Sequence, residues 1–225
     1  MLLLALDTSS AVSAAVHDGD GVLAERTVLD PRRHAELLVP TVDEVLTGAG
    51  VARGQLTDVV VGVGPGPFTG LRVALVTGRT LGLALGLPVH GICSLDALAL
   101  QALRFLDDVD GELVVATDAR RKEVYWSRYA AELSDGAPVR LRGPEVSRPA
   151  DVPIDGAVCV GRGAVLYADL LGGPADAPLD PQAGALAELA AVRLAAGGAG
   201  LEPPEPLYLR RPDAVVPAER KRVLR

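Results

Sequence analysis

The chain has 225 residues, of which 49% are hydrophobic, 23% charged and only 3% aromatic, which fits one large or two small globular domains and excludes disordered and fibrous proteins. The formal net charge of −7 excludes a protein that binds nucleic acid over its whole surface. An RNA contact would therefore be local or made through a partner. Two cysteines support neither a disulfide framework nor a cysteine-rich zinc site, and they favour a reducing cytoplasm.

Two apolar stretches have the hydrophobicity, but not the other features, of a targeting or membrane segment. Residues 1–6 lack a basic flank and lead directly into Asp7, so we expect no signal peptide. Residues 71–87 contain two arginines and three glycines, and they are too short and too interrupted to cross a membrane. We therefore expect a cytoplasmic protein without a membrane contact.

The first half predicts an α/β unit over residues 1–105. Alternating apolar runs and polar turns predict strands at 2–6, 11–17 and 22–27. A helical period predicts a helix over 34–47, which is followed by a buried strand at 59–63, a glycine-rich loop and a long helix from about residue 69 to 86. A short edge strand at 87–92 and a helix at 95–104 with Ser94 as its N-cap complete the unit.

The second half, residues 106–225, repeats this order in a smaller lobe. Strands are predicted at 112–118 and 123–129, and Asp118 is the counterpart of Asp7 because each ends a strand and begins a polar turn. A strand at 157–160, a glycine turn and a helix at 164–171 follow. Residues 134–155 predict connecting strands and loops, 182–196 a helix, and 203–212 an extended tail. The sequence thus predicts two duplicated α/β lobes.

Two such lobes suggest a nucleotide cleft between them. In this arrangement backbone N–H groups of the turns face phosphates, and a carboxylate reaches a metal ion through water. The candidates are Asp7, Thr8, Ser9 and Asp118. The alternative is that both segments are ordinary polar hairpin turns, since these residue types favour turns through local hydrogen bonds.

The loop at 62–70 adds Gly64 and Gly66 to the nucleotide candidates, because it precedes a helix N-terminus, where anions bind favourably. It is not a Walker A loop, and Pro65 and Pro67 have no N–H to donate. A structural role that brings strand and helix close together is at least equally supported.

Small residues recur every fourth position in the long helix: Gly70, Ala74, Gly78, Gly82 and Gly86. Three interior glycines cost a helix about 2–3 kcal/mol relative to alanine, so a close backbone contact must offset them. That contact is with the protein's own sheet or with a partner helix. The helix is apolar nearly all round, which favours a partner.

No catalytic residue and no metal site is predicted. The three histidines are scattered, no Gly-x-Ser-x-Gly motif occurs, and both cysteines follow apolar runs that indicate burial. Residues 120–122 and the terminal cluster of Arg220, Lys221, Arg222 and Arg225 could contact phosphate, although solvated basic segments are more common.

Four segments resemble the TsaB (YeaZ) family: LALDTSS at 4–10, GVGPGPFTGLR at 62–72, GICSLDAL at 91–98 and DARRKEVY at 118–125. The second string is the most specific. The resemblance extends from Met1 to Arg210 and is weaker in the second half. It implies the duplicated two-lobe α/β fold of the actin, Hsp70 and sugar-kinase group.

The resemblance also implies a function. Members are non-catalytic subunits that pair with the catalytic homologue TsaD in forming N6-threonylcarbamoyladenosine at position 37 of tRNA, alongside the ATPase TsaE. They pair with TsaD, or with themselves as homodimers, through two helices of the first lobe. The interface residues carried over to this chain are His34, Leu37, Leu38, Arg72, Val73, Gly78 and Gly82.

Further expectations follow from the resemblance. No cofactor is required, although ATP or ADP with magnesium can bind near the junction with TsaD, and tRNA is contacted only indirectly or weakly. Replacement of Gly78 or Gly82 by leucine should block association and leave the fold intact.

The rival hypothesis is an autonomous phosphotransferase or ATPase that uses Asp7 and Asp118 around magnesium. A metallopeptidase ranks third.

Overall fold

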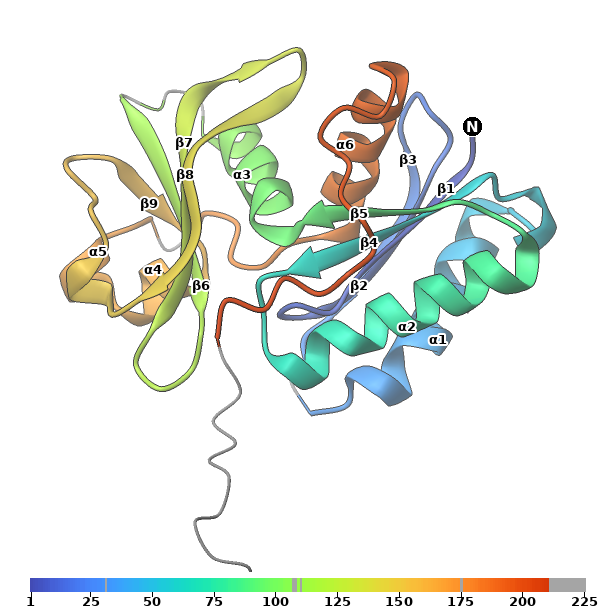
Figure 1. Ribbon diagram of the computed structural model, residues 1–225, viewed down its shortest axis with the longest axis horizontal. Helices are drawn as coiled ribbons and strands as arrows, with labels where there is room; N and C mark the ends of the chain where they lie inside the picture. Colours follow the sequence, from blue (N-terminus) through green and yellow to red (C-terminus); the bar gives the residue numbers. More distant parts are fainter. Residues whose placement is uncertain (31, 107–108, 110, 175, 211–225) are drawn as a thin grey trace, which may run out of the picture.

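The computed structural model describes residues 1–30, 32–106, 109, 111–174 and 176–210 and contains two β-sheets side by side (Figure 1). Sheet 1 has the order β3-β2-β1-β4-β5, and sheet 2 has the order β8-β7-β6-β9. The strands are β1 (Leu3–Asp7), β2 (Val12–His17), β3 (Val22–Val28), β4 (Asp58–Gly64), β5 (Val89–Cys93), β6 (Glu112–Asp118), β7 (Val124–Ser134), β8 (Ala137–Ser147) and β9 (Val158–Val160). The helices are α1 (His34–Ala49), α2 (Phe68–Leu85), α3 (Ser94–Phe105), α4 (Arg162–Leu166), α5 (Ala168–Leu171) and α6 (Ala183–Ala195), with short 3-10 turns η1 (Arg53–Gln55) and η2 (Pro149–Asp151).

The inner strands of sheet 1, β2, β1 and β4, are buried on both faces because helices cover each face. Strand β1 is entirely buried, and its alternating side chains enter two different cores. Leu4 and Leu6 pack with α1 and α2, whereas Leu3 and Ala5 pack with α6. The continuous apolar runs of β1 and β4, which pair in parallel, follow from this double coverage.

Sheet 2 is covered in the same manner. One face of β6 presents Leu113 and Val115 to α3, and the other presents Val114 and Ala116 to a core that includes residues of α4 and α5. Both sheets place an antiparallel hairpin beside a parallel strand: β1 pairs with β2 and β4, and β6 pairs with β7 and β9. This correspondence confirms the predicted fold class, an α/β protein with two duplicated lobes.

Helices α3 and α6 lie between the sheets and contact each other. Helix α3 follows β5 of sheet 1 but packs on sheet 2, and α6 follows the elements of sheet 2 but packs on sheet 1 (Figure 1). Sheet 1 also caps α6, since Ser13 accepts a hydrogen bond from the N–H of Ala183 and Glu25 accepts one from the N–H of Gly184, each at 2.8 Å. The proposed lobe boundary near residue 105 stays a prediction because both helices pack across it.

The described end of the chain returns along sheet 1 to sheet 2. Glu202 forms an isolated antiparallel bridge with Gly91 of β5, and the N–H of Leu207 donates to the carbonyl of Val63 at 2.8 Å. Arg210 then pairs with Glu123 beside the β6–β7 hairpin. This extended segment, residues 201–210, therefore links the two lobes. The basic cluster at residues 220–225 lies outside the described residues.

Most predicted elements are confirmed within a few residues, with three differences. Ser94 is not the N-cap of α3, since the helix begins at Ser94 itself and its hydroxyl donates to Asp7. The helix predicted over 164–171 is two short helices divided at Tyr167. Residues 134–155 contain one long edge strand, β8, whose bulges and prolines hide the period of two. No helix among the described residues has both the length and the hydrophobicity needed to cross a membrane.

The small-residue stripe of α2 packs against the protein's own sheet, and the prediction that it forms a partner contact was wrong. An added Cβ at Gly78 would lie 2.3 Å from Val61 of β4, and one at Gly82 would lie 2.3 Å from Val89 of β5. The glycines therefore allow α2 to approach sheet 1 closely. Leucine at either position would force the helix away from the sheet, so these variants cannot leave the fold intact.

We expect Gly78→Ala to destabilise the protein by about 1–3 kcal/mol, because overpacking against Val61 outweighs the better helix propensity of alanine. Gly48→Ala in α1 is the matched control, since its Cβ would meet only Ala24 at an ordinary 3.6 Å. The control should be neutral or more stable by up to about 1 kcal/mol. Urea unfolding of both variants measures the difference. Equal stability of the two would contradict the packing role of Gly78.

Candidate functional site

Asp7, the first nucleotide candidate, lies buried at the end of β1. Its Oδ1 accepts hydrogen bonds from the N–H and the hydroxyl of Ser9 at 2.7 and 2.6 Å, and its Oδ2 accepts one from the hydroxyl of Ser94 at 2.5 Å. Burial raises the pKa of the Asp7 carboxyl, and the hydrogen bonds from Ser9 and Ser94 oppose this rise. The glycine at position 62 leaves room for this carboxylate, because a Cβ there would lie 1.8 Å from Oδ2. The carboxylate is thus enclosed by its own chain.

Thr8 joins β1 to the beginning of α2. Its hydroxyl donates to the carbonyl of Gly70 at 2.7 Å and accepts from the N–H of Ala74 at 3.0 Å. A Cβ at Gly70 would lie 2.7 Å from the carbonyl oxygen of Thr8, so the helix meets the strand backbone directly. Thr8 therefore bridges the carbonyl of Gly70 and the N–H of Ala74, four residues apart in α2, and fixes the beginning of this helix to the end of β1.

The two candidate glycines of the glycine-rich loop are tightly packed against neighbouring atoms. A Cβ at Gly64 would lie 2.8 Å from Leu71, and one at Gly66 would lie 2.8 Å from the carbonyl oxygen of Ser9. Gly64 also has a positive φ of 99°, which glycine adopts without strain. These positions explain the two glycines by close packing. The use of Gly64 and Gly66 for nucleotide binding stays a prediction.

A cleft with a volume of about 470 Å³ separates the two lobes. Of the predicted nucleotide residues, it brings Ser9 and Asp118 together and leaves the other four outside its lining. Its remaining lining residues come from both lobes: Ser10, Ala11, Leu29, Asp30, His34, Pro67, Thr69, Gly70, Arg120 and Arg162. The cations of the cleft are already paired, since Arg120 lies 3.3 Å from Asp118 and Arg162 donates to Asp180 at 2.9 Å.

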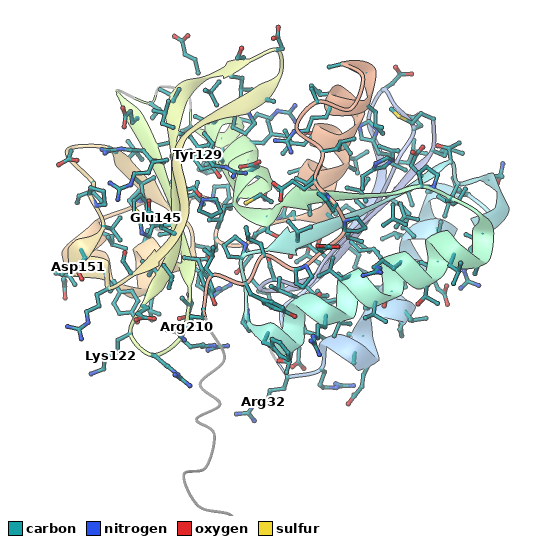
Figure 2. The ribbon with its side chains drawn as sticks, viewed as in Figure 1. Arg32, Lys122, Tyr129, Glu145, Asp151 and Arg210 are labelled. Carbon is teal, nitrogen blue, oxygen red and sulfur yellow. The ribbon has the colours of Figure 1, made fainter. Side chains whose placement is uncertain are left out.

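A second pocket of about 460 Å³ lies where α2, the β6–β7 hairpin and residues 208–210 meet. Phe68, Tyr125 and Tyr208 line it together with Arg120, Arg121 and Arg210. The rings of Phe68 and Tyr208 stack with their centroids 5.0 Å apart. In Figure 2, Lys122 of the hairpin and Arg210 lie at the same edge of the molecule. This pocket was not predicted from the sequence, although the aromatic and basic residues of the tail were a signal for it.

The hairpin beside this pocket has an unusual backbone. Arg120, Arg121 and Lys122 all have positive φ, between 54° and 62°, although none of them is glycine. Asp118 supports the turn because its Oδ1 accepts the N–H of Arg120 at 2.7 Å. Asp118 therefore acts as a turn-stabilising residue. This role agrees with the alternative interpretation of the Asp7 and Asp118 segments as ordinary polar hairpin turns.

The predicted partner residues do not form one exposed surface. Leu38 is fully buried in the core of sheet 1, so this prediction was wrong. His34 faces the cleft, where its Nε2 lies 2.9 Å from the carbonyl oxygen of Ser10. Leu37 and Val73 are half-buried, and Arg72 is exposed but lies 4.0 Å from the ring of Phe68.

Helices α1 and α2 nevertheless expose other apolar side chains. Leu83 is 86% exposed and Val76 is 61% exposed, seven residues apart on the side of α2 that faces away from the sheet. Val39 of α1, a helix in contact with α2, is 51% exposed. These residues were not predicted from the sequence, although Val76 and Leu83 lie opposite the glycines of α2 in the helical period. We call Val39, Val76 and Leu83 the exposed helix surface.

The described part of the chain offers little support for a metal site or for a cysteine nucleophile. It holds no group of three or more His, Cys, Asp or Glu residues arranged for a metal ion. His17 accepts from the N–H of Gly19, and His90 lies 2.9 Å from Asp58. Burial raises the pKa of the thiols of Cys93 and Cys159 to about 12, so neither is an activated nucleophile.

The fold and the cleft define a two-lobed α/β protein built from a duplicated sheet unit. A family model described as "TsaD: tRNA N6-adenosine threonylcarbamoyltransferase" matches residues 13–147. A solved structure, YeaZ from Pseudomonas aeruginosa, superposes with a TM-score of 0.78 at 34% identity and covers 92% of this chain and 99% of its own. The chain belongs to the TsaB/YeaZ family, as the sequence motifs predicted.

Two curated relatives match over different lengths. An uncharacterized protein of Mycobacterium leprae is 44% identical over 218 residues, which are 95% of this chain and 56% of that protein. The tRNA threonylcarbamoyladenosine biosynthesis protein TsaB of Escherichia coli is 33% identical over 129 residues, which are 57% of this chain and 55% of that protein. The chain thus spans about half the length of the first relative, and the match to the second covers about half of each protein.

Asp7→Asn and Asp7→Ala test whether the carboxylate is structural. Asparagine keeps an acceptor for Ser9 and should change the free energy of unfolding by less than about 1 kcal/mol, whereas alanine should cost about 2–4 kcal/mol because Ser9 and Ser94 lose their acceptor. The raised pKa of Asp7 contributes stability at acid pH that is lost as pH rises through the folded-state pKa. Asp7→Asn lacks this contribution, so its stability relative to the unsubstituted protein should increase with pH.

Urea unfolding across the acid to neutral range measures both effects. A magnesium ligand would be revealed by a different measurement: Asp7→Asn would abolish Mg²⁺–ATP binding, measured by calorimetry.

Proposed function

We propose that this chain is a non-catalytic subunit of the system that forms N6-threonylcarbamoyladenosine in tRNA, where it binds and activates a TsaD-type subunit. Family membership and the similarity to the E. coli protein TsaB, a tRNA threonylcarbamoyladenosine biosynthesis protein, support the pathway. The observation that carries the subunit role is the exposed helix surface. Val76 and Leu83 point outward from α2, and the opposite, glycine-containing side of this helix packs closely against sheet 1. We infer that these exposed apolar side chains of two neighbouring helices belong to one interface, because a contiguous exposed apolar patch marks a site of protein interaction.

The state of the potential catalytic groups supports a non-catalytic role. Asp7 accepts three hydrogen bonds from its own chain, and the two cysteines are buried with raised pKa values. The autonomous kinase or ATPase needs a carboxylate that is open to a metal ion, and of the two predicted carboxylates only Asp118 lines the cleft. We propose accordingly that the subunit needs no nucleotide of its own.

The surface that binds TsaD should also form a homodimer of the free protein, because apolar residues of this kind seldom stay uncovered. The net charge of −7 supports a tRNA contact that is made mainly through the partner.

Val76→Glu and Leu83→Glu test the surface. Each introduces a charge into the apolar interface and should weaken binding to the TsaD-type subunit at least about tenfold, because an unpaired charge there loses its water. Thermal stability should not change, since both side chains are exposed. Leu166→Glu on α4, which is 56% exposed on the other lobe, is the matched control. Calorimetric titration gives the affinities, and light scattering gives the oligomeric state. Normal binding by both α2 variants would contradict the proposed surface.

Activity tests the function itself. Threonylcarbamoyl transfer to tRNA by the purified TsaD-type subunit, with TsaE and the adenylate-forming enzyme present, should depend on this chain. The folded Val76→Glu variant should fail to support it, and Leu166→Glu should support it fully. Transfer at an equal rate without the chain would reject the activating role.

A further inference from the structure

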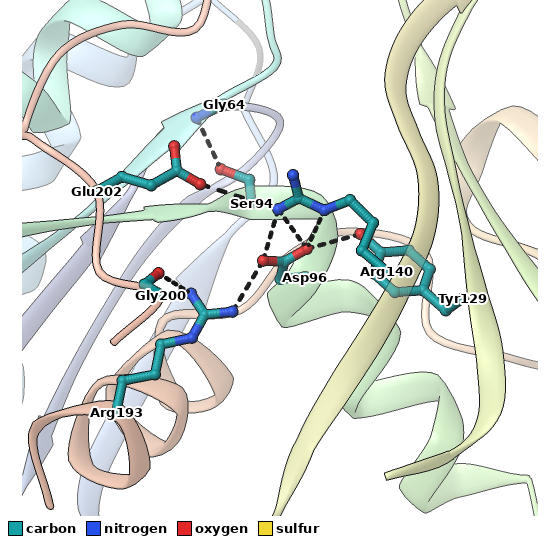
Figure 3. A network of polar contacts seen from close by, with 8 residues as sticks. All are labelled: Gly64, Ser94, Asp96, Tyr129, Arg140, Arg193, Gly200 and Glu202. Carbon is teal, nitrogen blue, oxygen red and sulfur yellow. Dashed lines mark hydrogen bonds and ion pairs between the residues drawn. The ribbon is translucent and has the colours of Figure 1, made fainter. Parts of the chain in front are cut away.

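A buried carboxylate joins the two lobes at the beginning of α3. Asp96 lies in the first turn of this helix and is 3% exposed. From the side of sheet 2, Arg140 of β8 donates to both of its oxygens at 2.7 Å, and the hydroxyl of Tyr129 of β7 donates to Oδ1 at 2.9 Å. From the side of sheet 1, Arg193 of α6 donates to Oδ2 at 3.0 Å. Figure 3 shows these donors converging on one carboxylate from opposite directions.

The surroundings of Asp96 complete this contact. Glu202, which bridges to β5 of sheet 1, has its Oε1 3.8 Å from Arg140, and Arg193 also donates to the carbonyl of Gly200 at 2.9 Å. Two carboxylates therefore balance two guanidinium groups at the lobe junction. Directional hydrogen bonds to a planar carboxylate restrict the relative orientation of the groups that make them.

A second carboxylate repeats the arrangement before α6. Asp180 is 8% exposed and accepts from the hydroxyl of Ser10, which follows β1 of sheet 1, at 2.5 Å. It also accepts from Arg162 of α4, on the side of sheet 2, at 2.9 Å. Ser10 and Arg162 both line the cleft between the lobes. A closing motion of the cleft would have to move these two residues relative to each other while both are bound to Asp180.

We propose that the Asp96 and Asp180 contacts form two interlobe locks, which hold the lobes at one fixed angle so that the cleft does not close around a ligand. A hinge motion is absorbed by φ and ψ changes in a few loop or element-terminal residues, and directional contacts across the junction oppose it. Here each of the two helices between the sheets has a buried carboxylate at or just before its beginning, and donors from the sides of both sheets bind that carboxylate. Buried ion pairs add little net stability, and the role proposed for these two is to fix the orientation of the lobes.

The two interlobe locks predict that substitution of one arginine bound to Asp96 or Asp180 loosens the angle between the lobes. Arg140→Met removes the ion pair between Asp96 and sheet 2 and leaves Asp96 paired with Arg193. Arg193→Met removes the ion pair with α6 and leaves Asp96 paired with Arg140. Neither variant leaves the buried carboxylate without a cation. Arg162→Met opens the second lock. Arg128→Met is the matched control, because Arg128 is a largely buried arginine of β7 whose partners, Glu112 and Asp155, belong to its own lobe.

Pulsed electron spin resonance measures the angle as a distance between spin labels at Thr47→Cys in α1 and Asp169→Cys in α5, both exposed. The native cysteines are buried and should not be labelled. The unsubstituted labelled protein should give one narrow distance distribution that millimolar Mg²⁺–ATP does not change. Arg140→Met, Arg193→Met and Arg162→Met should broaden the distribution or shift its mean, and Arg128→Met should not.

Three outcomes would overturn the proposal. The first is a broad or two-peaked distribution in the unsubstituted protein, and the second is a shortening of the distance by Mg²⁺–ATP. The third is an unchanged narrow distribution in every lock variant that circular dichroism shows to be folded. The first two outcomes need no variant, so loss of folding in a variant does not prevent a decision.

Discussion

The backbone of α2 lies almost in contact with sheet 1, and the orientation of every other residue of that helix depends on this approach. Gly78 and Gly82 meet valines of β4 and β5 at distances that no Cβ could occupy. With the glycine side fixed against the sheet, the helical period turns Val76 and Leu83 outward. Because Gly78 and Gly82 serve the packing of α2 on its own sheet, Val76 and Leu83 become the candidates for binding a second protein.

Acidic side chains that could serve catalysis or binding are used to connect elements. Asp7 binds the turn after β1 to the beginning of α3 through Ser94, and Asp96 and Asp180 connect the lobes. Each of these carboxylates is buried and accepts hydrogen bonds from its own chain, which compensates the cost of removing it from water. A carboxylate held in this way is a poor ligand for magnesium, because its lone pairs already have donors.

The sequence predicted the order of the strands, the duplication and the family, since apolar runs and turn residues are local signals. It could not predict which way the glycine stripe of α2 faces, because small residues permit close approach to a sheet and to a helix equally well. Leu38 was misplaced for a similar reason: the helical period identifies an apolar side but not what covers it. The three successive residues with positive φ at 120–122 have no sequence signal, since none is glycine or asparagine.

A fixed angle between the lobes is suited to a binding subunit and unsuited to a kinase. An enzyme that transfers phosphate from a nucleotide gains by closing around it and excluding water. A subunit that presents a surface gains by being rigid, since less conformational entropy is lost when the partner binds. The hairpin at 119–123 belongs to one lobe and the exposed helix surface to the other, so a partner that touches both requires the lobe angle to be set beforehand. Buried carboxylates at the beginning of α3 and before α6 supply that constraint without a ligand.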